Sequence, residues 1–183
     1  TQFWIGFDQI SMLAAKTIEW TRPANGIIEL STRYVDMAGK DCYPVAEEIA
    51  LLCGVPCAYV IDVIDRMFAF YRDLQGEKFQ GPFPQFLRDR YGREYAGHER
   101  DLESGVIGET CDVLGNFLPA ATLTSVGIGI SGESLPELLR KLFLDHTPEN
   151  MAIRARIVPE ASKVGAHQFV RHIDPTQCER SSW

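Results

Sequence analysis

One stretch of this 183-residue chain constrains its fold more than any other. Between Tyr59 and Leu74, apolar side chains recur at spacings of three and four residues, and charged side chains fall largely between them. This period is that of an amphipathic α-helix, so we predict a helix of about five turns with one face on a core. Core packing is the commonest role of an aromatic-rich face of this kind.

The remaining segments predict an α+β fold that is rich in helix. β-Branched and aromatic residues favour strands over 2–7 and 122–130, and an extended segment over 27–35. Residues 75–97 hold many Gly, Pro and charged residues, which indicates a loop or a broken helical linker. Helical spacing recurs in five further segments, at 10–20, 45–53, 98–114, 134–144 and 148–157.

The composition is that of an ordinary globular protein, with 45% hydrophobic and 23% charged residues. The length predicts one domain, with room for a tail. No run of 18 apolar residues and no signal peptide is visible, so we expect no membrane span and a cytoplasmic location. Because the first residue is Thr1, we expect a trimmed chain or a fragment of a longer protein.

The net charge of −7 argues against general binding to nucleic acid. A small anionic ligand remains compatible with it, because a local cluster of Arg decides that affinity. Four Arg residues do gather in the last thirty positions, where Asp and Glu are sparse: Arg154, Arg156, Arg171 and Arg180.

The five cysteines do not indicate a disulfide framework or a metal site. Cys53 and Cys57 are spaced to share a helical face, but Pro56 separates them. No second pair with His completes a zinc set. We therefore expect buried free thiols and no metal.

Three polar residues at alternate positions form the candidate binding site. Glu29, Ser31 and Arg33 would point to the same side of an extended segment. They would offer a carboxylate, a hydroxyl and a cation to one ligand, and Arg suits a phosphate because its donors match two phosphate oxygens. A solvated face of a strand would show the same pattern, so the pattern alone leaves both readings open.

Two segments resemble the flavin-dependent thymidylate synthases. Residues 10–22 (ISMLAAKTIEWTR) and 29–34 (ELSTRY) resemble the strand, helix and end of the signature R-H-R-x-x-S-x-N-E-x-S-x-R. Residues 118–128 (LPAATLTSVGI) are similar to a stretch of the longer relatives built from two halves, most of all their first half. The resemblance implies a family-like domain over 1–150 with a small, mostly antiparallel sheet, followed by a basic C-terminal segment over 151–183.

The resemblance also implies a reaction, the reductive methylation of dUMP to dTMP. Methylenetetrahydrofolate would supply the carbon and NADPH would reduce a bound FAD. Ser31 would be the catalytic-site residue that hydrogen-bonds the nucleotide, while Glu29 and Arg33 would bind the same substrate. Family members form tetramers, so the resemblance implies a homo-oligomer, up to a tetramer, in which the helix at 59–74 serves an interface as well as a core.

The flavin-binding part of the signature, its R-H-R triplet, is poorly matched in this chain. Only Arg22 matches the R-H-R triplet. At the C-terminus, Arg171 and His172 match its first two positions again, within a segment that a coincidental basic tail would also explain. Arg22, Arg171 and His172 are therefore the predicted cofactor-binding residues. The alternative is a catalytically degenerate domain that binds a nucleotide or a partner subunit without turnover.

Overall fold

The computed structural model of the chain describes residues 2–20, 24–32, 34–145, 147–170 and 173. These residues fall into two compact units. We call residues 1–29 with 124–183 the sheet unit, and residues 30–123 the helical unit.

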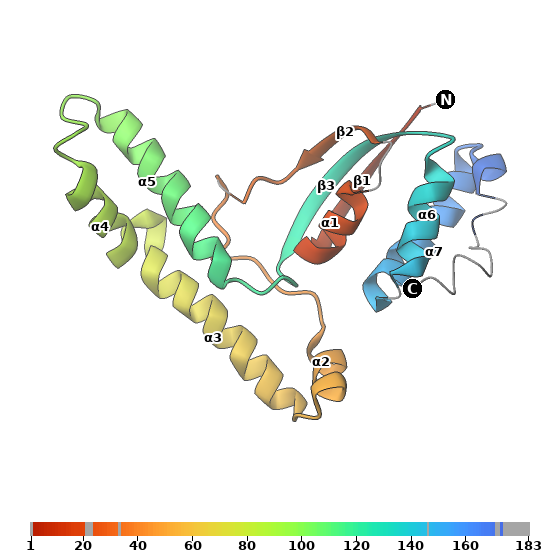
Figure 1. Cartoon of the computed structure of the whole chain (residues 1–183), viewed down its shortest axis with the longest axis horizontal. Coiled ribbons are helices and arrows are strands. Elements are labelled where there is room, and N and C mark those ends of the chain that lie inside the picture. Colours follow the sequence, from red (N-terminus) through yellow and green to blue (C-terminus); the bar gives the residue numbers. More distant parts are fainter. Residues whose placement is uncertain (1, 21–23, 33, 146, 171–172, 174–183) are drawn as a thin grey trace. The chain divides into compact units, whose positions relative to one another are not determined.

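The sheet unit is built on a three-stranded antiparallel sheet with the strand order β1-β3-β2 (Figure 1). The strands are β1 (Gln2–Ser11), β2 (Ala24–Glu29) and β3 (Leu123–Ser131). In the β2–β3 pair, Ile27 lies opposite Ile128 and Glu29 opposite Val126. Alternate residues of β3, including Val126, Ile128 and Ile130, are buried, which is the pattern of a sheet with one face on a core.

Three helices pack with that buried face, namely α1 (Met12–Glu19), α6 (Leu135–Leu144) and α7 (Pro148–Lys163). The helix α6 lies between the other two and contacts both. Its apolar residues are at spacings of three and four, so Leu135, Leu138, Leu139 and Leu142 are all buried. A short 3₁₀ helix over His167–Phe169 follows α7.

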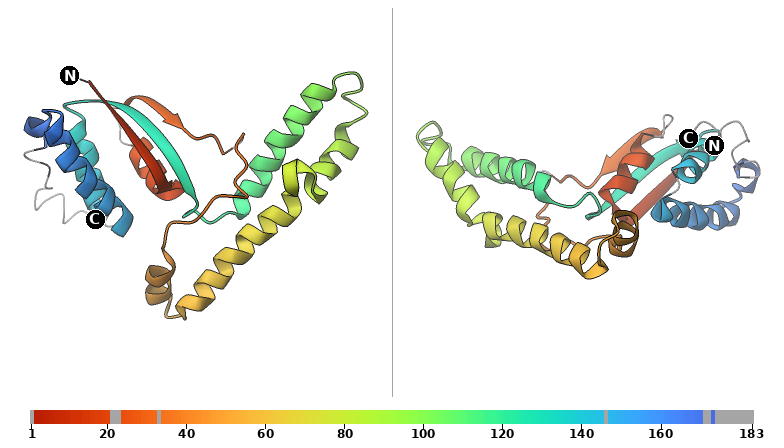
Figure 2. Two further views of the ribbon diagram at one scale, coloured as in Figure 1. Left: turned by 180° about the vertical axis from the view of Figure 1, so that it is seen from behind. Right: turned by 60° about the horizontal axis from the view of Figure 1, so that its bottom comes forward.

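The helical unit has a thinner core. Its helices are α2 (Ala46–Cys53), α3 (Cys57–Gln75), α4 (Pro82–Tyr91) and α5 (Glu99–Leu114), with 3₁₀ turns at Glu77–Phe79 and Gly115–Phe117 (Figure 2). One buried cluster holds α3 and α5 together and consists of Met37, Phe68, Tyr71, Leu114 and Leu118.

The turn between α3 and α4 depends on two glycines. A Cβ on Gly81 would lie 2.5 Å from the backbone nitrogen of Gly76, and Gly76 has a φ of +68°. Other residues would clash in the first position and be strained in the second. The pair therefore allows the chain to reverse tightly after α3.

The α+β class is confirmed, and so is the long amphipathic helix, which is α3. Of the two readings of residues 75–97, a loop or a broken helical linker, the second is confirmed, because α4 lies within the segment. Pro82 occupies the first turn of α4, where a missing N–H costs nothing. Helix α7 runs to Lys163 and crosses residue 150, where the sequence suggested the start of a C-terminal segment.

The extended segment over 27–35 is wrong in its second half. Strand β2 ends at Glu29, and the chain then turns, with the N–H of Tyr34 donating to the carbonyl of Ser31 at 3.3 Å. A turn does not keep the alternation of a strand. The argument that Glu29 and Ser31 share one side of a strand therefore fails, and Arg33 lies outside the described residues.

Among the described residues, none of the helices combines the length and the apolar character that crossing a membrane requires. The cytoplasmic location stays a prediction.

A buried carboxylate connects β1 to α7. The N–H of Ser11 donates to Oε1 of Glu149 at 2.7 Å, and its hydroxyl donates to Oε2 at 2.5 Å. The same hydroxyl accepts from the N–H of Ala14 at 2.9 Å and so caps α1. One serine thus joins the end of β1, the start of α1 and the first turn of α7.

We predict that Ser11→Ala lowers the free energy of unfolding by about 2–4 kcal/mol, because it removes a helix cap and a hydrogen bond to a buried carboxylate. Urea unfolding followed by circular dichroism measures the change. Ser162→Ala, on the exposed side of α7, is the control and should cost less than about 0.5 kcal/mol. Equal losses in the two variants would contradict this role for Ser11.

Candidate functional site

The structure describes only two residues of the predicted nucleotide site, Glu29 and Ser31. Glu29 lies on β2, and one of its carboxylate oxygens is 3.0 Å from Nζ of Lys16 on α1. The same ammonium lies 2.7 Å from Glu19. Partial burial opposes the charge of Lys16, but the two carboxylates outweigh it and raise its pKa. Glu29 is therefore already paired with a cation of its own unit, Lys16.

Ser31 lies exposed in the turn after β2. Arg33, Arg22, Arg171 and His172 fall outside the described residues. The roles predicted for Ser31 and these four residues, and the predicted use of FAD, NADPH and methylenetetrahydrofolate, remain predictions.

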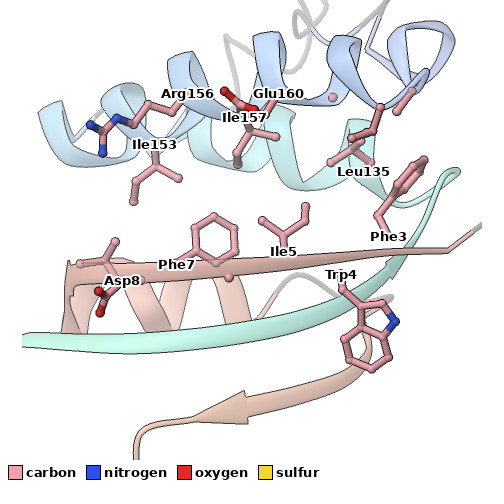
Figure 3. A pocket seen from close by; sticks show the side chains of 15 residues that line it. Phe3, Trp4, Ile5, Phe7, Asp8, Leu135, Ile153, Arg156, Ile157 and Glu160 are labelled. Carbon is pink, nitrogen blue, oxygen red and sulfur yellow. The ribbon is translucent and has the colours of Figure 1, made fainter.

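The sheet unit has a pocket that the sequence did not indicate. It lies between β1 and α7 and has a volume of about 360 Å³ (Figure 3). Its walls are mostly apolar and include Phe3, Ile5, Phe7, Ile153, Ile157 and Ala161. The signal for it was present as alternating apolar residues in β1 and a helical repeat in α7. Each pattern, however, also fits a fully covered core.

Three charged residues stand among these apolar walls. Glu160 on α7 is 2.6 Å from the ammonium of Lys163, and Asp8 on β1 accepts the hydroxyl hydrogen of Ser125 at 2.5 Å. Arg156 is the third. Among the described residues that line the pocket there is no histidine and no cysteine.

The helical unit exposes an apolar stripe along α3. Tyr59, Val63 and Phe70 follow one another at helical spacing, and the side chains of Tyr59 and Phe70 are 58% and 47% exposed. Phe70 meets the ring of Phe117 edge to face, with ring centres 5.0 Å apart. Phe117 is itself 43% exposed, so the surface continues from α3 to the end of α5. We call these four residues the α3 stripe.

The helical unit also contains a buried thiol and a buried phenol. Burial raises the pKa of Cys111 to about 11 and that of Tyr71 to about 12. Sγ of Cys111 lies 3.9 Å from the carbonyl oxygen of Val35. Both groups are neutral at physiological pH, so neither is a ready nucleophile.

We predict that Cys111 reacts slowly with iodoacetamide at every pH up to about 10, whereas Cys53, whose side chain is exposed, reacts faster at pH 8. The thiolate is the reactive form, and a raised pKa keeps Cys111 protonated. Mass spectrometry of peptides after timed labelling measures both rates. Equal rates in the folded protein at pH 8 would contradict the burial of Cys111.

Comparison with known proteins gives two distant relatives. The UPF0159 protein Ta1429 of Thermoplasma acidophilum is 28% identical over 167 residues, which cover 80% of this chain and 33% of that protein. A UPF0159 protein of Chlamydia muridarum is 26% identical over 176 residues, which cover 93% of this chain and 32% of that protein. No protein-family model matches the chain.

These findings correct the assignment to the flavin-dependent thymidylate synthases, which was wrong. The homology is distant and is to UPF0159 proteins. The E-x-S-x-R pattern that suggested the assignment lies partly outside the described residues, and strand β2 stops before it is complete. The chain spans about a third of the length of the curated relatives that it matches.

Proposed function

We propose that this chain is an assembly domain, which binds a second copy of itself through the α3 stripe of the helical unit. The observation that carries this proposal is the exposure of large apolar side chains on a helix that already has a core face. On α3, Val60, Phe68 and Tyr71 are buried, while Tyr59 and Phe70 lie on a neighbouring stripe and remain exposed.

Covering these side chains would supply the driving force for assembly. Fully burying a residue such as Val or Phe contributes about 1.5–3 kcal/mol. Contiguous exposed apolar surface is typical of interaction sites in soluble proteins, and aromatic residues are enriched in interfaces. The helix α2, which packs on α3, adds Leu51 and Leu52, which are 84% and 78% exposed.

The charges on α3 favour a second copy as the partner. Asp62 and Arg66 form an ion pair one turn apart, beside the stripe. If two α3 helices pack antiparallel about a two-fold axis near residues 64 and 65, Tyr59 of one copy lies opposite Phe70 of the other. The same axis brings Arg66 of each copy toward Asp62 of the other. Such an isologous contact is self-complementary in both shape and charge.

We predict that the protein is at least dimeric at micromolar concentration and that Val63→Asp makes it monomeric, because a charge would then lie in the apolar contact. Size-exclusion chromatography with light scattering gives the mass, which for one chain is 20.6 kDa. Ala58→Asp, an exposed position on a different face of α3, is the control and should leave the mass unchanged. A wild-type mass of one chain at every concentration would refute the proposal.

A second candidate is the reductive methylation of dUMP to dTMP with FAD, methylenetetrahydrofolate and NADPH. It now rests on the residue pattern around Ser31 alone, and the observation in its favour is that Ser31 is exposed. The pocket beside β1 does not favour FAD, because Arg156 is the only cation among the described residues of its lining, which also include Asp8 and Glu160. A pyrophosphate requires more positive charge than that arrangement provides.

For this second candidate, we expect purified protein to absorb near 450 nm and dUMP to raise its melting temperature, because a ligand that binds the native state stabilises it. Arg33→Ala should abolish the shift with dUMP. Differential scanning fluorimetry and an absorption spectrum are sufficient measurements. A colourless protein that takes up no FAD and shows no shift would leave assembly as the function.

A further inference from the structure

Strand β1 is an edge strand whose outer side is not paired within the described residues. The sheet order is β1-β3-β2, so β1 has β3 on one side only. It runs for 10 residues, with the apolar sequence FWIGF near its start. Proteins usually protect a long edge of this kind by charge, Pro, or a covering element, since its N–H and C=O groups invite another strand.

The pocket described above runs along this edge. Every residue from Phe3 to Asp8 lines it, although successive side chains of a strand point to opposite faces of the sheet. Figure 3 shows the side chains of Phe3, Ile5 and Phe7 pointing toward α7 and that of Trp4 pointing away from it. The pocket therefore also meets the backbone of β1 between these side chains, and a Cβ on Gly6 would meet nothing within 4 Å.

The helix layer makes room beyond the edge. Neighbouring helices pack about 8–10 Å apart, whereas neighbouring strands lie only about 4.8 Å apart. Three helices side by side are therefore wider than three strands. Because α7 forms the wall of the pocket opposite β1, this excess lies on the β1 side. The result is a space beside β1 that α7 bounds on one side and that no strand among the described residues fills.

We infer that this groove binds an extended segment of a different polypeptide, which adds to β1 as a fourth strand. An apolar small molecule would fill the groove but leave the N–H and C=O groups of the edge buried and unpaired, which is costly. A second copy of this chain would bring its own α7 into the same space, and two helices need more separation than two paired strands allow. A single strand satisfies the edge and fills the groove.

The groove also defines the chemistry of that segment. Side chains at alternate positions must be apolar to fit against Phe3, Ile5 and Phe7. Figure 3 shows Arg156 and Ile153 above the Phe7–Asp8 end of β1, and Leu135 above the Phe3 end. Because Glu160 forms an ion pair with Lys163, Arg156 is the charged side chain that would interact with a partner. The segment should therefore carry an acidic residue at the Asp8 end.

Selection of peptides on the full chain tests this inference. The probe is a phage-displayed library of random twelve-residue peptides, followed by hydrogen–deuterium exchange with one enriched peptide. We expect enriched peptides to alternate apolar and polar residues and to contain Asp or Glu. We also expect that peptide to slow exchange at alternate amides of residues 3–8, because only alternate N–H groups of a strand face its outer edge.

A charge swap tests the contact with Arg156. Arg156→Glu should weaken binding of the acidic peptide about tenfold or more, as expected for a charged hydrogen bond. A peptide with Lys in place of its acidic residue should recover affinity for that variant. Ala155→Glu is the matched control, because Ala155 is the exposed neighbour and does not line the pocket. Its affinity should stay within about twofold of the wild type.

Three results would overturn the inference. The first is no enrichment of peptides over unmodified phage, or enrichment without slower exchange in β1. The second is protection of β1 that grows with protein concentration in the absence of peptide, which would indicate a second copy. The third is binding of the dye 8-anilinonaphthalene-1-sulfonate that is lost in Arg156→Glu while no peptide binds, which would indicate a small amphipathic molecule.

Discussion

The arrangement of the sheet unit depends on the buried carboxylate of Glu149. It accepts both the backbone N–H and the hydroxyl hydrogen of Ser11, a residue 138 positions away in the sequence. Glu149 is 8% exposed, so an unpaired charge there would be strongly unfavourable. Because Ser11 ends β1 and caps α1, this pair sets where the first turn of α7 meets the sheet. A second contact nearby, from the Thr17 hydroxyl to Asp145, fastens α1 to the end of α6.

The groove beside β1 follows from that anchor. Helix α7 starts where Glu149 meets Ser11 at the end of β1, and its further turns face the earlier residues of the strand. Ile153 and Ile157 still join the core, whereas Arg156 and Glu160 reach the pocket. The anchor thus holds one end of the helix by hydrogen bonds and leaves the space between helix and strand to be filled by apolar contact. This combination is favourable for a site that accepts a chain segment.

The helical unit obeys a different constraint. Its core is small, and α3 is apolar over more of its circumference than that core covers. The excess, in Tyr59 and Phe70, stays 58% and 47% exposed although Phe70 also contacts the ring of Phe117. Polar residues, including Asp62 and Arg66, stand beside it. Such a surface is consistent with an element whose second partner comes from outside the unit.

The sequence alone determined the class of the fold and most of its elements, because helical and strand periods are local. The spacing over Tyr59–Leu74 predicted α3, and the residues of β3 predicted a strand. It left residues 75–97 as either a loop or a broken helical linker, because Gly and Pro mark helix starts and loops alike, and it could not show that β2 stops at Glu29. Only the tertiary structure decided the rest. The Ser11–Glu149 contact and the groove join residues 2–11 to residues 148–164, and no local pattern encodes how far apart two such segments come to rest.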